Sequence, residues 1–119
     1  MSLRVAVVGG GPGGLFFASQ LKGLDPSAEV TVLERNQPED AFGFGVVFSD
    51  STLNQIHSAD PVLREALAEH GTHWDRIEVW LKGEKRAFGG NGMAAIHRRV
   101  LLPILQERAR ELGVVMRFG

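Results

Sequence analysis

The feature that most constrains this chain is a glycine-rich loop near its start. Residues 9–14 read Gly-Gly-Gly-Pro-Gly-Gly and contain G-x-G-x-x-G with Gly9, Gly11 and Gly14 in register. The apolar run 3–8 before the loop predicts a strand buried on both faces, and apolar residues at helical spacing after the loop predict a helix. A strand entering such a loop and a helix leaving it form the context in which this pattern binds a dinucleotide.

The residues of this loop have distinct physical roles. Gly9 permits the tight turn, and Gly11 lets the backbone approach a pyrophosphate because it has no Cβ. Gly14 lets the helix pack closely on the strand. Pro12 and Gly13 begin the helix, whose unpaired N–H groups and dipole favour phosphate. All five residues are therefore predicted to bind the cofactor.

An acidic residue completes the pattern. Glu34 lies 20 residues beyond Gly14, at the end of a second β-branched strand over residues 30–33. A carboxylate there accepts hydrogen bonds from the hydroxyls of an adenosine ribose, and it disfavours a 2′-phosphate. The alternative, a glycine turn with a solvated Glu, explains neither the spacing nor the strand–helix context.

The pattern predicts an α/β fold of Rossmann-like type. The third strand is expected over residues 114–118, giving a three-stranded parallel sheet of order 3-2-1 with helices around it. The helix before it, over residues 101–112, contains Pro103 and is therefore expected to start late. Since the third strand would be an unpaired edge, a homodimer through that edge is expected.

The middle of the chain predicts a different arrangement. Residues 35–50 contain a proline and a Gly-Phe-Gly stretch, which indicates a loop. Asp50 or Ser51 is expected to cap a short helix that runs through residue 56 or 57. Asp60 is expected to cap the next helix, which ends before Gly71. An antiparallel hairpin is predicted over residues 76–88. Three aromatic side chains in and beside it are expected to pack in its core, with stacking on a base or ring as the alternative. These aromatics are Trp74, Trp80 and Phe88.

Composition excludes several function classes. The 119 residues are enough for one domain, and the net charge of −1 offers no field for a nucleic acid or an anionic membrane. There is no cysteine, so thiolate chemistry is absent. The four histidines show no metal-ligand spacing, and we expect no metal site. No membrane-span or leader pattern occurs, so a cytoplasmic location is the default expectation.

Three stretches of the sequence resemble the FAD-dependent aromatic-ring hydroxylases. The first is the glycine loop followed by Glu34-Arg35, which is more similar to FAD-binding proteins than to nicotinamide dehydrogenases. The second is Gly43-Phe44-Gly45-Val46-Val47-Phe48-Ser49-Asp50, which looks closest to the monooxygenase part of 2-aminobenzoyl-CoA and salicylyl-CoA hydroxylases. The third is Ile96-His97-Arg98-Arg99-Val100-Leu101, which is similar to the family's Arg-x-x-Leu at a helix start.

The resemblance implies a set of further cofactor contacts. Arg35 would flank the adenosine, and Phe44, Gly45 and Val46 would lie beside the flavin or its ribityl chain. Arg98 would lie near the FAD diphosphate or ribose; Arg99 takes that role if the register shifts by one. For each of these residues an alternative without cofactor contact stays open: a solvated surface charge for the arginines, and an ordinary turn for the stretch around Gly45.

The resemblance also implies the reaction. NAD(P)H reduces FAD, and the reduced flavin with dioxygen hydroxylates a small aromatic substrate, here an aromatic CoA thioester. The chain lacks the family's Asp-Gly and later Gly-Asp segments and an expected arginine before Gly45. We therefore interpret residues 1–119 as a fragment of an N-terminal FAD-binding domain, inactive alone. In it, the hairpin 76–88 would belong to an incomplete substrate-side sheet, and no catalytic residue can be named.

Two other functions fit the same residues. One is the FAD-binding part of a different flavin oxidoreductase, such as an amine oxidase or a relative of the disulfide reductases. The other is a non-catalytic module that binds a dinucleotide without turnover. Continuation of the reading frame into the family's later segments would favour the hydroxylase over both.

Overall fold

The computed structural model, which describes residues 2–90 and 92–119, divides into two compact units. The first unit is built from the segment up to Phe44 and from the segment Arg98–Gly119, and the second is Gly45–His97. The sequence has a second glycine-rich stretch at 89–92, and its residue Asn91 lies outside the described residues.

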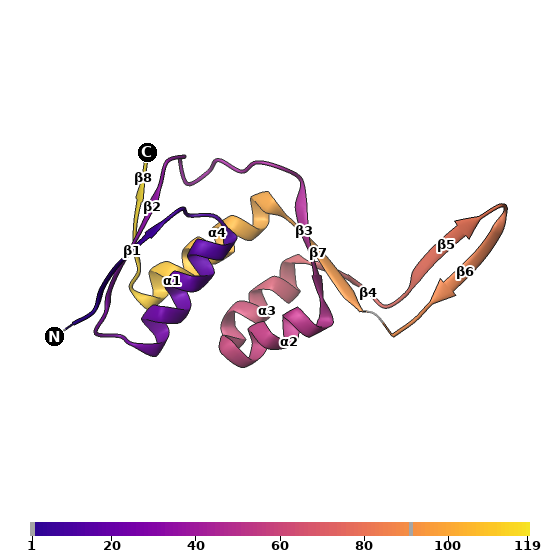
Figure 1. Ribbon diagram of the computed structural model, residues 1–119, viewed down its shortest axis with the longest axis horizontal. Coiled ribbons are helices and arrows are strands. Elements are labelled where there is room, and N and C mark those ends of the chain that lie inside the picture. Colours follow the sequence, from indigo (N-terminus) through magenta and orange to yellow (C-terminus); the bar gives the residue numbers. More distant parts are fainter. Residues whose placement is uncertain (1, 91) are drawn as a thin grey trace. The chain divides into compact units, whose positions relative to one another are not determined.

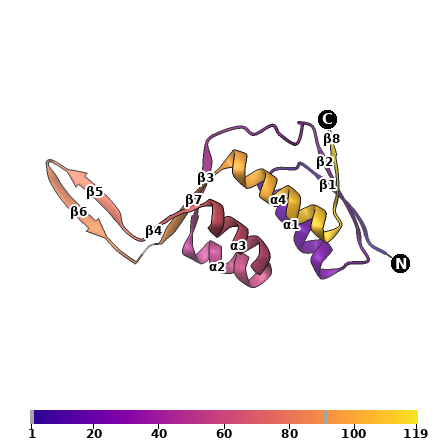
Figure 2. The ribbon, with the colours of Figure 1, turned by 180° about the vertical axis from the view of Figure 1, so that it is seen from behind.

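The first unit is a parallel sheet with two helices (Figure 1). The strands follow the order β1-β2-β8, so β2 is central, and both pairings are parallel. Helices α1 and α4 pack side by side on one side of this sheet, as both views show (Figures 1 and 2). The elements are β1 Arg4–Val8, α1 Pro12–Leu24, β2 Glu29–Glu34, α4 Arg98–Leu112 and β8 Val115–Phe118. The predicted three-stranded parallel sheet is confirmed.

The core of the first unit lies between the central strand and the two helices. Val30 and Val32 of β2 are buried, and so are apolar side chains of both helices. These helix residues are Leu15, Ala18, Leu101, Leu105 and Ala109. The prediction that the first strand is buried on both faces is wrong: β1 alternates between exposed and half-buried residues, and Val8 is 87% exposed. The reason is that both helices cover the same face.

Helix α4 corrects a second prediction. It begins at Arg98, so Pro103 lies in the helix interior and not in the first turn. Pro103 sits on the exposed side of the helix, whereas its neighbours Leu102 and Leu105 are buried. Burial of that apolar stripe outweighs the loss of one backbone hydrogen bond at the proline.

The second unit combines a small antiparallel sheet with two helices (Figure 1). Strand β7 is central and pairs with β3 and with β4. Its elements are β3 Gly45–Ser49, α2 Asp50–Ala59, α3 Pro61–His70, β4 Thr72–Trp74, β5 Ile77–Leu81, β6 Glu84–Phe88 and β7 Met93–His97. The predicted loop 35–50 is wrong from Gly45 onward, because β3 pairs with a segment about fifty residues later, in the register Gly45↔His97.

One of the two predicted helix caps of this unit is confirmed. Asp60 caps α3 by accepting a hydrogen bond from the Leu63 N–H at 3.2 Å, and Gly71 ends the helix. The predicted cap of α2 is wrong: Ser49 caps the helix by accepting a hydrogen bond from the Thr52 N–H at 3.2 Å, so Asp50 is the first helical residue, and the helix runs to Ala59.

The predicted hairpin is confirmed as β5–β6, with Lys82 and Gly83 at positive φ in its turn. It forms a two-stranded sheet of its own among the described residues. The expectation of core packing is wrong for Trp80 and Phe88, which are 66% and 52% exposed. No other described element covers the hairpin, whose strand residues are all exposed. The Lys85 Nζ lies 5.8 Å from the centre of the Trp80 ring.

Candidate functional site

The glycine loop joins β1 to α1 through a tight turn. Gly9 has a φ of +107° and donates a hydrogen bond to the Leu33 carbonyl at 2.8 Å. Gly11 caps α1 in an extended conformation without a side-chain cap, and Pro12 is the first helical residue. The first-turn N–H groups of an α-helix have no partner within the helix, so this end offers donors to an anion.

Gly14 is required by packing between the helix and the loop. A Cβ placed on Gly14 would overlap the Gly9 carbonyl oxygen and would lie 3.4 Å from a methyl group of Val7. A Cβ on Gly13 would meet nothing within 4 Å. Gly14 therefore fixes the approach of helix to strand, and Gly13 leaves open space at the helix start.

Glu34 lies directly against the glycine loop. Its Oε1 accepts a hydrogen bond from the Gly10 N–H, and its Oε2 accepts one from the Asn36 N–H, both at 2.9 Å. The Asn36 and Gly10 N–H groups hold the pKa of this carboxyl below its usual range. A Cβ on Gly10 would lie 2.9 Å from the Glu34 Cβ, which explains the absence of a side chain there. Each carboxylate oxygen can accept a further hydrogen bond.

Arg98 approaches the same loop from the start of α4. One of its terminal nitrogens lies 3.8 Å from the position of a Cβ on Gly11. Its Nε is buried and has no hydrogen-bond partner among the described residues. Arg99 is exposed. Of the two arginines that the sequence left open, it is Arg98 that adjoins the glycine loop.

One cavity brings these groups together in the first unit. It has a volume of about 50 Å³. It is lined by Gly10, Gly11, Glu34, Asn36, Gln37, Asp40, Phe42, Arg98, Leu102, Gln106 and Phe118. Arg98, whose Nε is buried without a partner among the described residues, the Glu34 carboxylate and the start of α1 are donors and acceptors suited to a nucleotide with a diphosphate.

The remaining predicted site residues lie elsewhere. Gly9, Pro12, Gly13 and Gly14 form the turn and the helix start next to the cavity without lining it. Arg35 and Phe44 are exposed and do not line the cavity; Phe44 is 93% exposed.

Gly45 and Val46 begin β3 in the second unit. A Cβ on Gly45 would lie 2.8 Å from the Ile96 carbonyl oxygen. Close pairing with β7 is therefore sufficient to require glycine at this position.

Sequence reasoning missed the contribution of residues 36–42 and of Gln106 to the cavity. The helical signal was present, since Arg98, Leu102 and Gln106 recur every four residues and so share one face of α4. For residues 36–42, no periodic pattern marks which side chains turn toward the loop.

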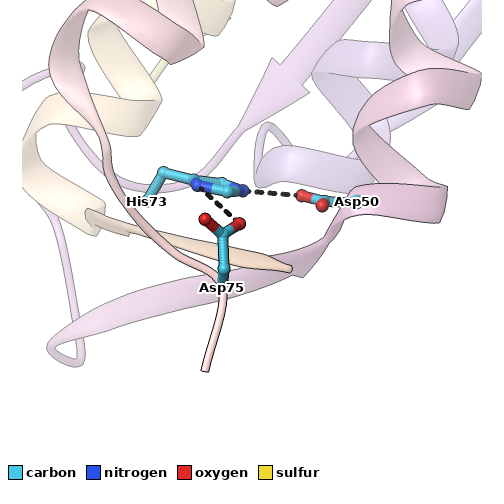
Figure 3. Close-up of side chains that lie close together, drawn as sticks. All are labelled: Asp50, His73 and Asp75. Atoms are coloured by element: carbon cyan, nitrogen blue, oxygen red, sulfur yellow. Dashed lines mark hydrogen bonds and ion pairs between the residues drawn. The ribbon is translucent and has the colours of Figure 1, made fainter. Parts of the chain in front are cut away.

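A second cluster of polar side chains lies in the other unit (Figure 3). His73 stands between two carboxylates: its Nε2 lies 2.9 Å from Asp50 Oδ1, and its Nδ1 lies 3.6 Å from Asp75 Oδ1. Three potential ligand atoms of these residues lie within 4.8 Å of one another. The cluster escaped sequence reasoning because Asp50 is 23 residues from His73. Each ring nitrogen of His73 thus faces a carboxylate oxygen. The absence of a metal site stays a prediction.

Among the described residues, no helix combines the length and the apolar character that crossing a membrane requires.

Comparison with known proteins gives clear relatives. A salicyloyl-CoA 5-hydroxylase from Streptomyces sp. is 63% identical over 116 residues, which cover 98% of this chain and 22% of that protein. The 3-hydroxy-4-methyl-anthranilyl-[aryl-carrier protein] 5-monooxygenase of Streptosporangium sibiricum is 34% identical, covering 98% of this chain and 33% of that protein.

This chain is a homologue of aromatic-ring monooxygenases. The resemblance predicted from the sequence is thereby confirmed. The chain spans between about a fifth and a third of the length of these curated relatives. No protein-family model matches it.

A solved structure supports the fold. The tetrameric form of 2-methyl-3-hydroxypyridine-5-carboxylic acid oxygenase superposes with a TM-score of 0.81 at 26% identity, covering 98% of this chain and 31% of that one. The fold of this chain is thus similar to that of part of a known oxygenase.

Proposed function

We propose that this chain is the FAD-binding portion of a flavoprotein monooxygenase that hydroxylates an aromatic ring, with NAD(P)H as the electron donor. The observation that carries the proposal is the cavity around Glu34 and Arg98. It joins the Glu34 carboxylate, an arginine Nε that is buried without a partner among the described residues, and the start of α1. The aromatic substrates that the relatives' names indicate and the sheet of three parallel strands support the same conclusion.

Different residues of the chain would bind different parts of the dinucleotide. The helix start at Gly11, Pro12, Gly13 and Gly14, after the turn at Gly9, would hold the diphosphate. The Glu34 carboxylate would accept hydrogen bonds from the ribose hydroxyls, using the lone pairs that Gly10 and Asn36 leave free.

The other predicted contacts have supporting roles. Arg98 Nε would donate to a phosphate oxygen and so gain the partner that it lacks among the described residues. Arg35 would flank the adenosine. Phe44, Gly45 and Val46 would lie on the flavin side. When bound, the flavin supplies hydride acceptance and dioxygen activation, and the chain supplies binding and orientation.

The arginine pair at the start of α4 offers the sharpest test. Arg98→Leu should weaken FAD binding about 10- to 100-fold, because a charge-assisted hydrogen bond contributes about 1.5–3 kcal/mol. Arg99→Leu is the matched control, since Arg99 is exposed. Binding is followed by flavin fluorescence, with a parallel titration of NAD. Equal affinity in the two variants, or tight binding of NAD alone, contradicts the proposal.

Glu34 allows a second comparison of a site variant with a control variant in the same FAD titration. Glu34→Ala should reduce FAD affinity because it removes the ribose acceptor. Glu39→Ala should not, because Glu39 is exposed and lines no part of the cavity.

The substrate proposal follows the relatives. We propose a small aromatic ring carried as a CoA thioester, as the name of the 63% identical relative indicates for that protein. The full-length protein should oxidise NAD(P)H faster when a hydroxybenzoyl-CoA is added, with a hydroxylated thioester as product. Oxidation unaffected by the thioester would exclude this substrate class.

Two further proposals concern the state of the chain. β1 and β8 are the edges of the parallel sheet, and an unpaired edge favours a homodimer. Size-exclusion chromatography of the chain tests this, with a purely monomeric peak as the contrary result. A cytoplasmic location is proposed as well, and cell fractionation checks it.

A further inference from the structure

Gln106 is a buried polar residue that the proposed binding chemistry does not use. It lies on α4, is only 6% exposed, and donates a hydrogen bond from its amide Nε2 to the Pro38 carbonyl oxygen at 3.1 Å. The two residues are 68 positions apart in the sequence. A buried amide with a satisfied donor is an ordered contact, and it connects α4 to the segment that follows β2.

This contact borders the candidate dinucleotide cavity. Gln106 itself lines the cavity, as do Arg98 and Leu102 on the same face of α4. Four residues of the segment 36–42 line it too. They are Asn36, Gln37, Asp40 and Phe42. Pro38, in the middle of the segment, is therefore hydrogen-bonded to α4, the helix that also carries Arg98.

The segment has little other support from regular structure. It contains no helix or strand, and apart from the Gln106 contact its hydrogen bonds among the described residues are short-range. The Gln37 N–H donates to Asp40 Oδ2 and the Asp40 N–H donates to the Gln37 carbonyl, each at 3.0 Å. The Asn36 N–H donates to Glu34. These local hydrogen bonds fix the conformation of the segment. The hydrogen bond from Gln106 to the Pro38 carbonyl oxygen holds the segment next to α4.

We propose that Gln106 is a positioning residue for dinucleotide binding. It holds the segment 36–42 against α4 and so keeps one wall of the cavity in place around Glu34 and Arg98. It acts on the cavity through its hydrogen bond to Pro38. This inference rests on the proposed FAD site and adds to it a residue outside the glycine loop and its acid.

The test compares Gln106→Leu with Gln20→Leu in the whole chain. Gln106→Leu keeps most of the side-chain volume and removes the donor. Gln20→Leu makes the same chemical change at a half-buried position of α1 outside the cavity. Two quantities are measured: the Kd for FAD from flavin fluorescence, and the hydrogen exchange of the amides of Asn36, Gln37 and Asp40 without ligand.

Gln106→Leu should raise the exchange of these three amides and raise the Kd for FAD about fivefold, the loss expected for one neutral hydrogen bond. Gln20→Leu should change neither quantity. A variant with wild-type exchange in 36–42 overturns the positioning role, whether or not FAD binds. Raised exchange with an unchanged Kd overturns it as well. Failure of the unsubstituted chain to bind FAD overturns the proposed function and is recognised separately, because exchange is measured without ligand.

Discussion

Replacing Gly14 with alanine tests whether the glycine loop is shaped by helix–strand packing. The added Cβ would overlap the Gly9 carbonyl oxygen and lie 3.2 Å from the Gly9 carbonyl carbon. Both atoms belong to the backbone, so no rotamer change relieves the contact, and α1 must move away from the loop. That movement loosens Leu15 and Ala18, which are buried in the core of this unit. Overpacking of this kind costs about 2–3 kcal/mol.

Gly13→Ala is the matched control for this substitution. Its Cβ would meet nothing within 4 Å, and Gly13 is an exposed helical residue. Alanine there should stabilise the chain by about 0.5 kcal/mol, because it restricts the unfolded state. The two variants should therefore differ by about 3 kcal/mol, or roughly 10 °C in Tm for a chain of this size.

Far-UV circular dichroism during urea and thermal unfolding measures this difference. Hydrogen exchange of the α1 amides locates it, because Trp74 and Trp80 both lie in the second unit and report on that unit. If Gly14→Ala is as stable as Gly13→Ala within about 0.5 kcal/mol, the packing explanation for Gly14 is refuted.

Three further substitutions have defined outcomes. Glu34→Gln should lower the free energy of unfolding at neutral pH, because the Asn36 and Gly10 N–H groups stabilise the ionised carboxylate and so lower its pKa. In urea titrations the difference in free energy of unfolding from wild type should shrink as the pH falls below 4.5, because the carboxylate becomes protonated; a difference independent of pH would contradict this. Asp60→Ala should cost about 1–2 kcal/mol by tryptophan fluorescence, more than Ser49→Ala, because the Asp60 cap is buried and the Ser49 cap is exposed; the reverse order would refute the reasoning. Pro103→Ala should raise stability by about 1–3 kcal/mol, since an exposed helix-interior site regains its N–H, and an unchanged Tm would show that the missing hydrogen bond costs nothing there.

The parts of the fold governed by local rules could be predicted from the sequence. The cap of α3 at Asp60 and the turn of the hairpin at Lys82 and Gly83 depend on neighbouring residues alone. The strand–loop–helix unit around the glycine loop is equally local, because its spacing fixes the turn and the helix start. Glu34 also belongs to this group, since the length of the crossover brings it to the loop.

Other parts depend on contacts between residues far apart in the chain. β3 is a strand because β7 pairs with it, and that partner follows two helices and a hairpin. β1 is half-exposed because both helices lie on the same side of the sheet, although its apolar run resembles a buried strand. Trp80 and Phe88 are exposed for a related reason: an aromatic residue is buried only where another element covers it.

For the site, the sequence by itself determined the glycine loop, its acid and the pair of arginines. Only the tertiary structure decided that Arg98 adjoins the loop with a buried Nε that has no partner in the described part of the chain, and that Gln106 donates to Pro38 across 68 residues. The physical reason is the distance along the chain over which each kind of interaction acts. Backbone conformation and capping are set by the nearest few residues, whereas the partner of a buried polar atom is set by which surfaces pack together.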